Sequence, residues 1–265
     1  MPPGEAIPAQ QSESTRLLAP DEPAPFFEHN GDGASPFLLV CDHAGNRLPK
    51  MLGTLGVAAA DLTRHVAWDV GIAPTARSLA EALDAPLIMS TYSRLLIDCN
   101  RNPEVASSMP KVSEVTTVPG NENITPDEAA VRVREIFAPY HDAIARQLDQ
   151  RQSAGRKSVL IALHSFTPVF GGMPRPWHCG VLYNRYSDLA LALQRLLQDD
   201  PQLVVGNNEP YSVTDDTDYT IPVHGERRGI PHVAIEIRHD LIETEAGQQQ
   251  WAALLARLLP KAAGV

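Results

Sequence analysis

The sequence predicts an α/β protein with three layers, α/β/α, around a central mixed sheet. Short runs of aliphatic and β-branched residues alternate along the chain with longer amphipathic stretches at helical spacing. The clearest run covers residues 159–163 and is typical of a strand that is buried on both faces. Alternation of this kind favours one sheet covered by helices on both sides.

Composition and charge restrict the class of protein. The chain has 265 residues and a formal net charge of -10, which argues against nucleic-acid and membrane-surface binding because both need a basic face. Cys41, Cys99 and Cys179 are too far apart for a thiolate zinc site or a disulfide framework. No segment is typical of a signal peptide or a membrane span. We therefore expect a soluble, cytoplasmic protein that binds a small anionic molecule, with its oligomeric state left open.

Residues 1–34 are rich in Pro, Glu, Ser and Ala and show no periodicity, so we expect an irregular N-terminal arm. Phe26 and Phe27 are expected to attach this arm to the rest of the protein. Residues 35–265 contain no repeat and no linker, which predicts a single domain.

The first strand is predicted over residues 36–41 and leads into Asp42 and His43. Gly45 and Asn46 then begin a turn. Glycine and asparagine at this place allow the backbone to approach a ligand closely.

Residues 61–83 have helical character, with an interruption near Pro74. This segment contains Asp69 beside Trp68. An aspartate among apolar neighbours is less favourable than one on a solvated face. Asp69 is therefore a candidate functional residue, the alternative being a helix cap or an exposed carboxylate.

Two strands are predicted at residues 85–89 and 95–98, and the second leads into the string DCNRNP. Polar side chains gather around it: Arg94, Asp98, Asn100 and Arg101. Because arginine forks bind carboxylates in a bidentate manner, we predict that Arg94, Asn100 and Arg101 bind the substrate. A structural Arg–Asp pair that closes the loop is the alternative.

A helix is predicted to begin at Thr125, with Pro126 in its first turn and Glu128 completing a capping box. Its inward face is formed by apolar residues at helical spacing: Ile136, Tyr140, Ile144 and Leu148. This spacing places His141 on the surface, and Pro139 is expected to kink the helix.

Two polar segments are predicted to be loops near the site. Residues 111–123 form the first, and residues 207–229 form the second and longer one. Loops of the latter length are usually functional or disordered. Because the second segment contains His224 and Arg227, we interpret it as a substrate lid in which these two residues bind the substrate.

The rest of the chain continues the alternation of strands and helices. Strands are predicted at residues 179–183, 203–205 and 232–238, and amphipathic helices at residues 189–197 and 243–259.

Two predicted strands each end in a histidine, His43 and His164. Open α/β sheets bind ligands at the carboxyl edge, where these two side chains would meet and could hold one metal ion. Asp69 is the first candidate for a third ligand, and Asp42 is the second. For each histidine taken alone, the alternative is a hydrogen-bonded residue at a strand end.

The last predicted strand carries Glu236 inside the apolar string VAIEIR, with Arg238 two residues later on the same face. A buried carboxylate costs several kcal/mol unless it is paired or used. We predict that Glu236 and Arg238 are catalytic; a buried structural pair of the two is the alternative.

Two histidines and a carboxylate that hold zinc, with a glutamate nearby, are typical of a metal-dependent hydrolase. Other nucleophiles have little support. Ser165 is not part of a G-x-S-x-G string, Cys99 has no evident base, and no glycine-rich phosphate loop is present.

Five strings, in this order along the chain, resemble the N-formylglutamate amidohydrolase family: CDHAGNRLP, SRLLIDCNRNP, LIALHSFTP, DYTIPVHGERRGIPH and VAIEIRHDLI. The resemblance implies a phosphorylase/hydrolase-like fold, related to zinc carboxypeptidases and aspartoacylases. It implies zinc-dependent hydrolysis of N-formyl-L-glutamate to formate and glutamate, a late step of histidine degradation.

The same resemblance implies roles for single residues. His43 and His164 fall on metal-ligand positions, Glu236 on the catalytic carboxylate, and Arg94 and Arg101 on substrate contacts.

One position departs from the related zinc enzymes. They carry a glutamate three residues after the first histidine, and here that residue is Asn46, so the third ligand stays open between Asp69 and Asp42. Two alternative functions also stay open: a zinc deacylase or carboxypeptidase-like hydrolase of another N-acyl amino acid, and a carboxylate-binding protein that has lost its chemistry.

Overall fold

The computed structural model describes residues 16–265, so residues 1–15 of the expected N-terminal arm lie outside the described residues. Seven strands form the central sheet: β1 (Phe26–His29), β2 (Phe37–Cys41), β3 (Leu87–Ser90), β6 (Val159–Phe166), β9 (Cys179–Leu182), β10 (Val205–Asn207) and β11 (His232–Arg238). Their order across the sheet is β1-β3-β2-β6-β11-β9-β10. The sheet is mixed, as predicted, because β1 and β9 run antiparallel to β3 and β11 while β3, β2, β6 and β11 are parallel.

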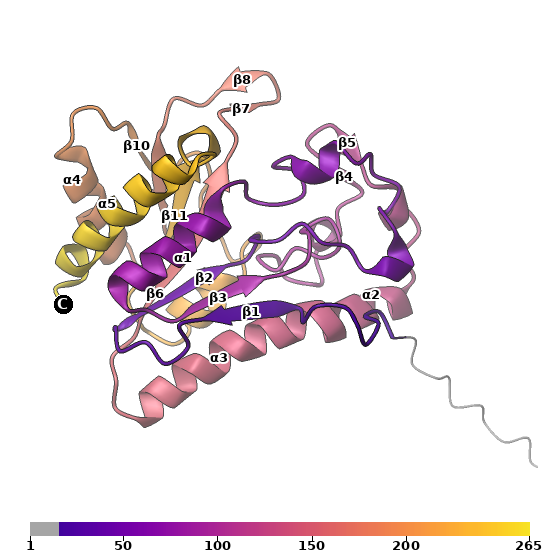
Figure 1. Ribbon diagram of the computed structural model, residues 1–265, viewed down its shortest axis with the longest axis horizontal. Coiled ribbons are helices and arrows are strands. Elements are labelled where there is room, and N and C mark those ends of the chain that lie inside the picture. The colour runs from indigo at the N-terminus through magenta and orange to yellow at the C-terminus, as the bar shows by residue number, and fades with distance from the viewer. Residues whose placement is uncertain (1–15) are drawn as a thin grey trace, which may run out of the picture.

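Helices cover both faces of this sheet (Figure 1). They are α1 (Ile72–Leu83), α2 (Pro126–Arg132), α3 (Ala138–Ser153), α4 (Asp188–Gln198) and α5 (Glu245–Ala263). The first, fourth and fifth lie on one face, and α3 lies on the other. The predicted three-layer α/β/α architecture is therefore confirmed.

Alternate residues of β2 show how the strands separate the two cores. Phe37 and Leu39 are buried in the cluster that contains α1, α4 and α5. Leu38 and Val40 point the other way, into the cluster that contains α3. Because successive side chains of a strand point to opposite faces, a strand that is apolar throughout is buried on both.

The prediction of an irregular arm is wrong for residues 26–29, which form the edge strand β1. This strand pairs with β3 in the register Phe26↔Ser90 and His29↔Leu87. A four-residue strand with two exposed residues has too short a pattern to be recognised. Phe26 packs against the core as expected, whereas Phe27 is exposed.

The segment predicted to be helical over residues 61–83 is helical mainly in α1, which begins at Ile72. Gly71 ends the preceding turn in the left-handed region at φ 78°, and a Cβ there would lie 2.2 Å from the carbonyl oxygen of Ile242. Asp69 therefore stands in a turn, where its N–H donates to the His43 carbonyl at 2.9 Å. Pro74 lies in the first turn of α1, where a missing N–H is tolerated.

No strand forms at residues 95–98, although Leu95 and Leu96 are fully buried there. Their carbonyl groups accept hydrogen bonds from side chains instead of a neighbouring strand. Asn121 donates to Leu95 O at 2.7 Å, and Arg132 donates to Leu96 O at 2.9 Å. The prediction of a strand was wrong because an apolar run indicates that a segment is buried. It does not indicate which groups form hydrogen bonds with the backbone of that segment.

His141 is buried, although its position in the helix predicted a surface residue. Its Nε2 lies 2.7 Å from Cys99 O, and its Nδ1 lies 3.0 Å from Nε2 of His224. Tyr219 packs against the His141 ring at 4.5 Å between centroids. The segment around His224 thus covers a helix face that would otherwise be solvated.

Thr125 and Glu128 form the predicted capping box. Pro139, where a kink was expected, lies in the first turn of α3, directly after a π-helical turn over Val133–Phe137. A missing N–H is tolerated at this position.

Two short hairpins stand at the upper edge of the molecule in Figure 1. They are β4 (Val112–Ser113) with β5 (Thr116–Thr117), and β7 (Val169–Phe170) with β8 (Met173–Pro174). The backbone N–H of Gly171 donates to Glu114 Oε1 at 3.1 Å, which joins the two hairpin turns. Among residues 16–265, no helix is both long and apolar enough to cross a membrane.

The buried pair of His141 and His224 should make the free energy of unfolding depend on pH. Burial lowers the pKa of His141 from 6.5 to about 4 and that of His224 from 6.5 to about 3. The native state then binds fewer protons than the unfolded chain below about pH 6.5. The contribution of the two histidines to the free energy of unfolding is fully present above that pH. It is lost as the pH falls towards their native-state pKa values.

We expect His224→Gln to reduce the loss of unfolding free energy between pH 7.5 and 5.5 by about 1 kcal/mol, since each such histidine contributes up to about 1.4 kcal/mol per pH unit. Urea denaturation at the two pH values measures this difference. His29→Gln on the edge strand is the matched control, because it removes a histidine without touching the pair. Equal pH dependence in wild type and His224→Gln would contradict the assignment.

Candidate active site

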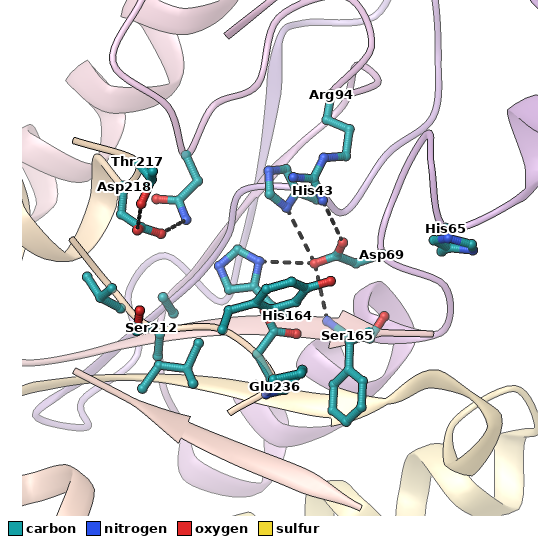
Figure 2. Close-up of a pocket in the computed structure, with 18 of the residues that line it drawn as sticks. His43, His65, Asp69, Arg94, His164, Ser165, Ser212, Thr217, Asp218 and Glu236 are labelled. Carbon is teal, nitrogen blue, oxygen red and sulfur yellow. Dashed lines mark hydrogen bonds and ion pairs between the residues drawn. The ribbon is translucent and has the colours of Figure 1, made fainter. Parts of the chain in front are cut away.

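A cavity of about 710 Å³ opens at the carboxyl ends of the central strands. His43 follows β2, His164 lies in the last part of β6, and Glu236 stands opposite His164 in the β11 ladder. Figure 2 shows these side chains converging, with Asp69 between the histidines and Glu236 on the opposite side of His164. The loop residues Ser212, Thr217 and Asp218 form another part of the wall.

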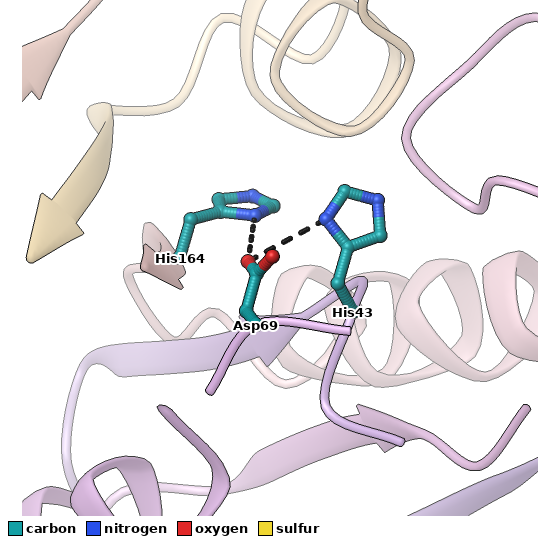
Figure 3. Close-up of side chains that lie close together, drawn as sticks. All are labelled: His43, Asp69 and His164. Atoms are coloured by element: carbon teal, nitrogen blue, oxygen red, sulfur yellow. Dashed lines mark hydrogen bonds and ion pairs between the residues drawn. The ribbon is translucent and has the colours of Figure 1, made fainter. Parts of the chain in front are cut away.

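Asp69 brings the two histidines together (Figure 3). Its Oδ2 lies 3.0 Å from Nδ1 of His164 and 3.5 Å from Nδ1 of His43. One ligand atom from each of the three buried residues lies within 4.8 Å of the others, the arrangement of a candidate metal site. The backbone N–H of Ser165 also donates to Asp69 Oδ2, at 3.2 Å, and so orients the carboxylate.

Two further carboxylates lie on the far side of the histidine rings. Nε2 of His43 lies 2.7 Å from Asp98 Oδ1, and Nε2 of His164 lies 3.2 Å from Asp42 Oδ2. Asp42, the second candidate for a third ligand, is thus placed behind His164, whereas Asp69 lies between the two histidines. Carboxylates behind metal-binding histidines commonly set the tautomer and the orientation of the ring.

Asp42 is itself held by two hydroxyl groups. Tyr140 donates to its Oδ1 at 2.8 Å, and Thr220 donates to the same atom at 2.7 Å. These contacts connect the site to α3 and to the loop that follows β10.

The buried charges create a strongly anionic centre. Burial raises the pKa of Asp69, but His43 and His164 lower it by more, so that the carboxyl stays ionised. Burial lowers the pKa of His164, but Asp42 and Asp69 raise it by more, and its pKa lies well above the ordinary value. A centre that favours a proton on a histidine this strongly also favours a cation.

The donor set fits a divalent metal ion. His43 Nδ1 is a buried atom without a hydrogen-bond partner, and so is Glu236 Oε2. Two imidazole nitrogens and one carboxylate oxygen match the ligands of catalytic zinc sites, which keep a further position open. His43, Asp69 and His164 would hold the ion.

Glu236 differs from the three aspartates in its environment. Burial raises its pKa to about 7, although His164 acts in the opposite direction. A carboxylate with a pKa near neutrality can accept and return a proton under physiological conditions.

Arg238, which was predicted to act with Glu236, is not part of the cavity wall. It forms an ion pair with Asp240 at 2.8 Å and donates to the carbonyl groups of Arg175 and Trp177, both at 3.3 Å. Arg238 is the last residue of β11, and its side chain leaves the direction that strand periodicity predicts. Neither the catalytic prediction nor the alternative of a Glu236–Arg238 pair has a contact in support.

Arg94 and Arg101 reach the cavity but carry acidic partners. Arg94 lies 2.8 Å from Asp98 and 3.6 Å from Asp69, and Arg101 lies 3.6 Å from Asp218. The structural Arg–Asp pair that was the alternative interpretation is therefore present between Arg94 and Asp98. Both guanidinium groups nevertheless line the cavity.

Asn100 also lines the cavity but uses its amide on the following loop. Its Nδ2 donates to Asp218 at 3.1 Å, and its Oδ1 accepts from the N–H groups of Tyr219 and Thr220, both at 3.1 Å. His224 and Arg227 do not line the cavity: His224 is buried against His141, and Arg227 is exposed. The part of this loop that lines the cavity is the earlier one, residues 208–214.

Several wall residues were not found from the sequence. His65 lies 3.0 Å from Glu114, and both line the cavity together with Phe170. Glu114 and Phe170 belong to the two hairpins, whose two-residue strands are too short to leave a periodic pattern. Residues 208–214, within the predicted lid, do line the cavity.

Comparisons with known proteins identify the family of this chain. A family model described as N-formylglutamate amidohydrolase matches residues 35–243. N-formylglutamate deformylase of Pseudomonas putida is 26% identical over 174 residues, which are 60% of this chain and 64% of that protein, so the match spans less than two thirds of the relative.

Solved structures give the same result for the fold. Gene product Atu2144 from Agrobacterium tumefaciens has a TM-score of 0.91 and 38% identity, over 94% of this chain and 98% of its own. N-formylglutamate amidohydrolase from Ralstonia eutropha JMP134 has a TM-score of 0.61 and 19% identity, over 91% of this chain and 98% of its own, and shares the fold. With its strand-end histidines, its buried glutamate and a family match over most of its length, the chain belongs to the N-formylglutamate amidohydrolase family.

Proposed function

We propose that this protein is a zinc-dependent amidohydrolase that removes the formyl group from N-formyl-L-glutamate, or a close N-acyl amino acid, and releases formate and glutamate. The observation that carries the proposal is the approach of His43, Asp69 and His164 to within 4.8 Å of one another. Glu236 stands opposite His164 in the same cavity. Family membership supports the hydrolytic reaction.

Zinc bound by His43, Asp69 and His164 would lower the pKa of a water molecule to about 7 and polarise the formyl carbonyl group. The protein supplies the orientation. Asp98 and Asp42 hold the outer nitrogens of the two histidines and so turn both Nδ1 atoms towards Asp69.

Glu236 is the residue that would move the proton. In its ionised form it accepts a proton from the attacking water, and it returns that proton to the nitrogen of the leaving amino acid. Its Oε2 is buried and has no hydrogen-bond partner among residues 16–265, so this oxygen is available to accept a proton.

Arg94 and Arg101 would orient the substrate. A guanidinium group has five N–H donors, so each arginine can keep its aspartate partner and still donate to an oxygen of the substrate. The neighbouring carboxylates, Asp98 and Asp218, fix the direction of the two forks. Arg94 is the closer of the two to the metal ligands, since it also lies 3.6 Å from Asp69.

The proposed function is tested by measuring formate release and zinc content on the same purified protein. N-formyl-L-glutamate should be hydrolysed with about one zinc per chain, the stoichiometry of a single catalytic site. N-acetyl-L-glutamate and N-succinyl-L-glutamate test the other deacylases. Hydrolysis of one of these and not of the formyl compound would replace the proposed substrate.

Glu236→Gln should lower kcat by about 10²–10⁴-fold, because the amide keeps the size of the side chain but cannot accept the proton. Zinc content, measured by elemental analysis, should not change. Wild-type activity should rise with pH as Glu236 ionises, with a midpoint at or below about 7, since a bound cation lowers the pKa further. This rise should be absent from the residual activity of the variant.

Glu226→Gln is the matched control, since Glu226 is also buried but binds Arg185 outside the cavity. It should reduce thermal stability and leave kcat near the wild-type value. Near-normal turnover in Glu236→Gln, with a lower melting temperature, would mean that Glu236 is structural.

Asp98→Asn should weaken zinc binding by about 10–100-fold, the usual effect of removing a carboxylate behind a histidine ligand. Competition with a chelator measures the affinity. Asp149→Asn is the control, because Asp149 is an exposed residue of α3 that pairs with Arg228. Equal affinities in Asp98→Asn and wild type would show that the His43–Asp98 contact does not orient the ligand.

A further inference from the structure

Arg175 is a cation at the edge of the cavity without an acidic partner. The arginines of the cavity wall, Arg94 and Arg101, both face carboxylates. Arg175 is half-buried, and no carboxylate of residues 16–265 lies within ion-pair distance of it. Its positive charge is therefore available to an anionic group from outside the protein.

Three aromatic rings surround this guanidinium group. Its carbon lies 4.6 Å from the centroid of Phe170, 4.7 Å from that of Tyr211 and 5.8 Å from that of Phe166. All three rings line the cavity, and they come from the end of β6, the β7–β8 hairpin and the loop after β10. Arg175 thus joins three segments of the wall from behind.

The hydrogen bond between Arg175 and Tyr211 has a defined direction. Nη1 of Arg175 donates to the Tyr211 hydroxyl oxygen at 2.8 Å. A guanidinium group cannot accept, so the hydroxyl proton of Tyr211 is left to donate elsewhere. No acceptor for it is found within the part of the chain that the structure describes.

Tyr211 lines the same cavity as Glu236 and keeps its proton. Burial raises the pKa of its phenol, and the charge of Glu236 adds to this effect. At neutral pH the side chain is therefore a neutral donor, and it contributes no negative charge that would repel an anion.

The backbone of Arg175 is fixed from two sides. Its N–H donates to Pro168 O at 2.8 Å, which closes the hairpin. Its own carbonyl group accepts from Arg238 at 3.3 Å. Arg238 thus holds the backbone of Arg175, and the side chain of Arg175 holds the Tyr211 hydroxyl group. The hydroxyl group therefore has a well-defined position.

We propose that Tyr211 and Arg175 together recognise a carboxylate of the amino-acid part of the substrate. Tyr211 donates the hydrogen bond, while Arg175 is a positioning residue that directs the hydroxyl group and supplies an unpaired positive charge behind it. The inference rests on the proposed function. N-formyl-L-glutamate has an α-carboxylate and a side-chain carboxylate, and the two are distinguished by experiment.

Tyr211→Phe should raise KM for N-formyl-L-glutamate by about 10–100-fold, the effect of losing one hydrogen bond to a charged group, with kcat within about threefold of wild type. N-formyl-L-glutamine lacks the side-chain carboxylate, and N-formyl-L-isoglutamine lacks the α-carboxylate. The variant should be no worse than wild type for the one analogue that lacks the recognised group.

Arg175→Met should raise KM in the same way, and the double variant should be little worse than either single one, because both remove the same contact. Arg175→Lys should restore part of the affinity, since an ammonium group still donates to the tyrosine. Arg185→Met is the matched control: Arg185 holds the same loop through Asp215 but does not line the cavity. Arg185→Met should change KM by the same factor in wild type and in Tyr211→Phe.

The inference is overturned if wild type hydrolyses N-formyl-L-glutamate and Tyr211→Phe has the same KM for it. It is also overturned if Tyr211→Phe raises KM by the same factor for N-formyl-L-glutamate and for both analogues. If wild type hydrolyses none of the compounds, the proposed function fails. Calorimetric measurement of the Kd for L-glutamate then tests carboxylate recognition separately. A Kd about tenfold higher in Tyr211→Phe would support recognition of the carboxylate. An unchanged Kd, or no binding by wild type, would end the proposal.

Discussion

Three buried aspartates surround the two histidines at the strand ends, and the rest of the site depends on the electrostatic balance among them. Burying a carboxylate is strongly unfavourable unless a positive charge lies beside it. Within ion-pair distance, the partners of Asp69, Asp42 and Asp98 among the described residues are His43, His164 and Arg94. This excess of negative charge explains why the histidine pKa values are raised and why a divalent cation fits between the rings.

Glu236 is buried to a similar extent, yet its pKa changes in the opposite direction from those of the aspartates. Asp69 and Asp98 each bond directly to a histidine, and Asp42 accepts hydrogen bonds from Tyr140 and Thr220. No such bond stabilises the buried Oε2 atom of Glu236. Two kinds of carboxylate therefore exist around the two histidines: three aspartates that stay ionised, and Glu236, which titrates near neutrality. Separation of pKa values in this way commonly divides metal binding from proton transfer.

The walls of the cavity follow a different principle. Four segments far apart in sequence meet there: the two hairpins, the loop after β10 and the turn after β3. They are joined by single polar contacts, such as Gly171 with Glu114 and Asn100 with Asp218. Because these contacts hold loops and not core strands, substrate selection can change in evolution without altering the metal centre.

The sequence alone determined the α/β class, the buried strands that carry or lead into His43, His164 and Glu236, and the capping box at Thr125. All of these depend on local periodicity or on residues adjacent in the chain. Only the tertiary structure decided that Asp69 lies between the histidines and Asp42 behind one of them, that Arg238 turns away, and that His224 pairs with His141. Those outcomes depend on which distant segments of the chain meet. Periodicity predicts the direction of a side chain only within a regular strand or helix, and these side chains lie at the ends of such elements or are placed by contacts with other segments.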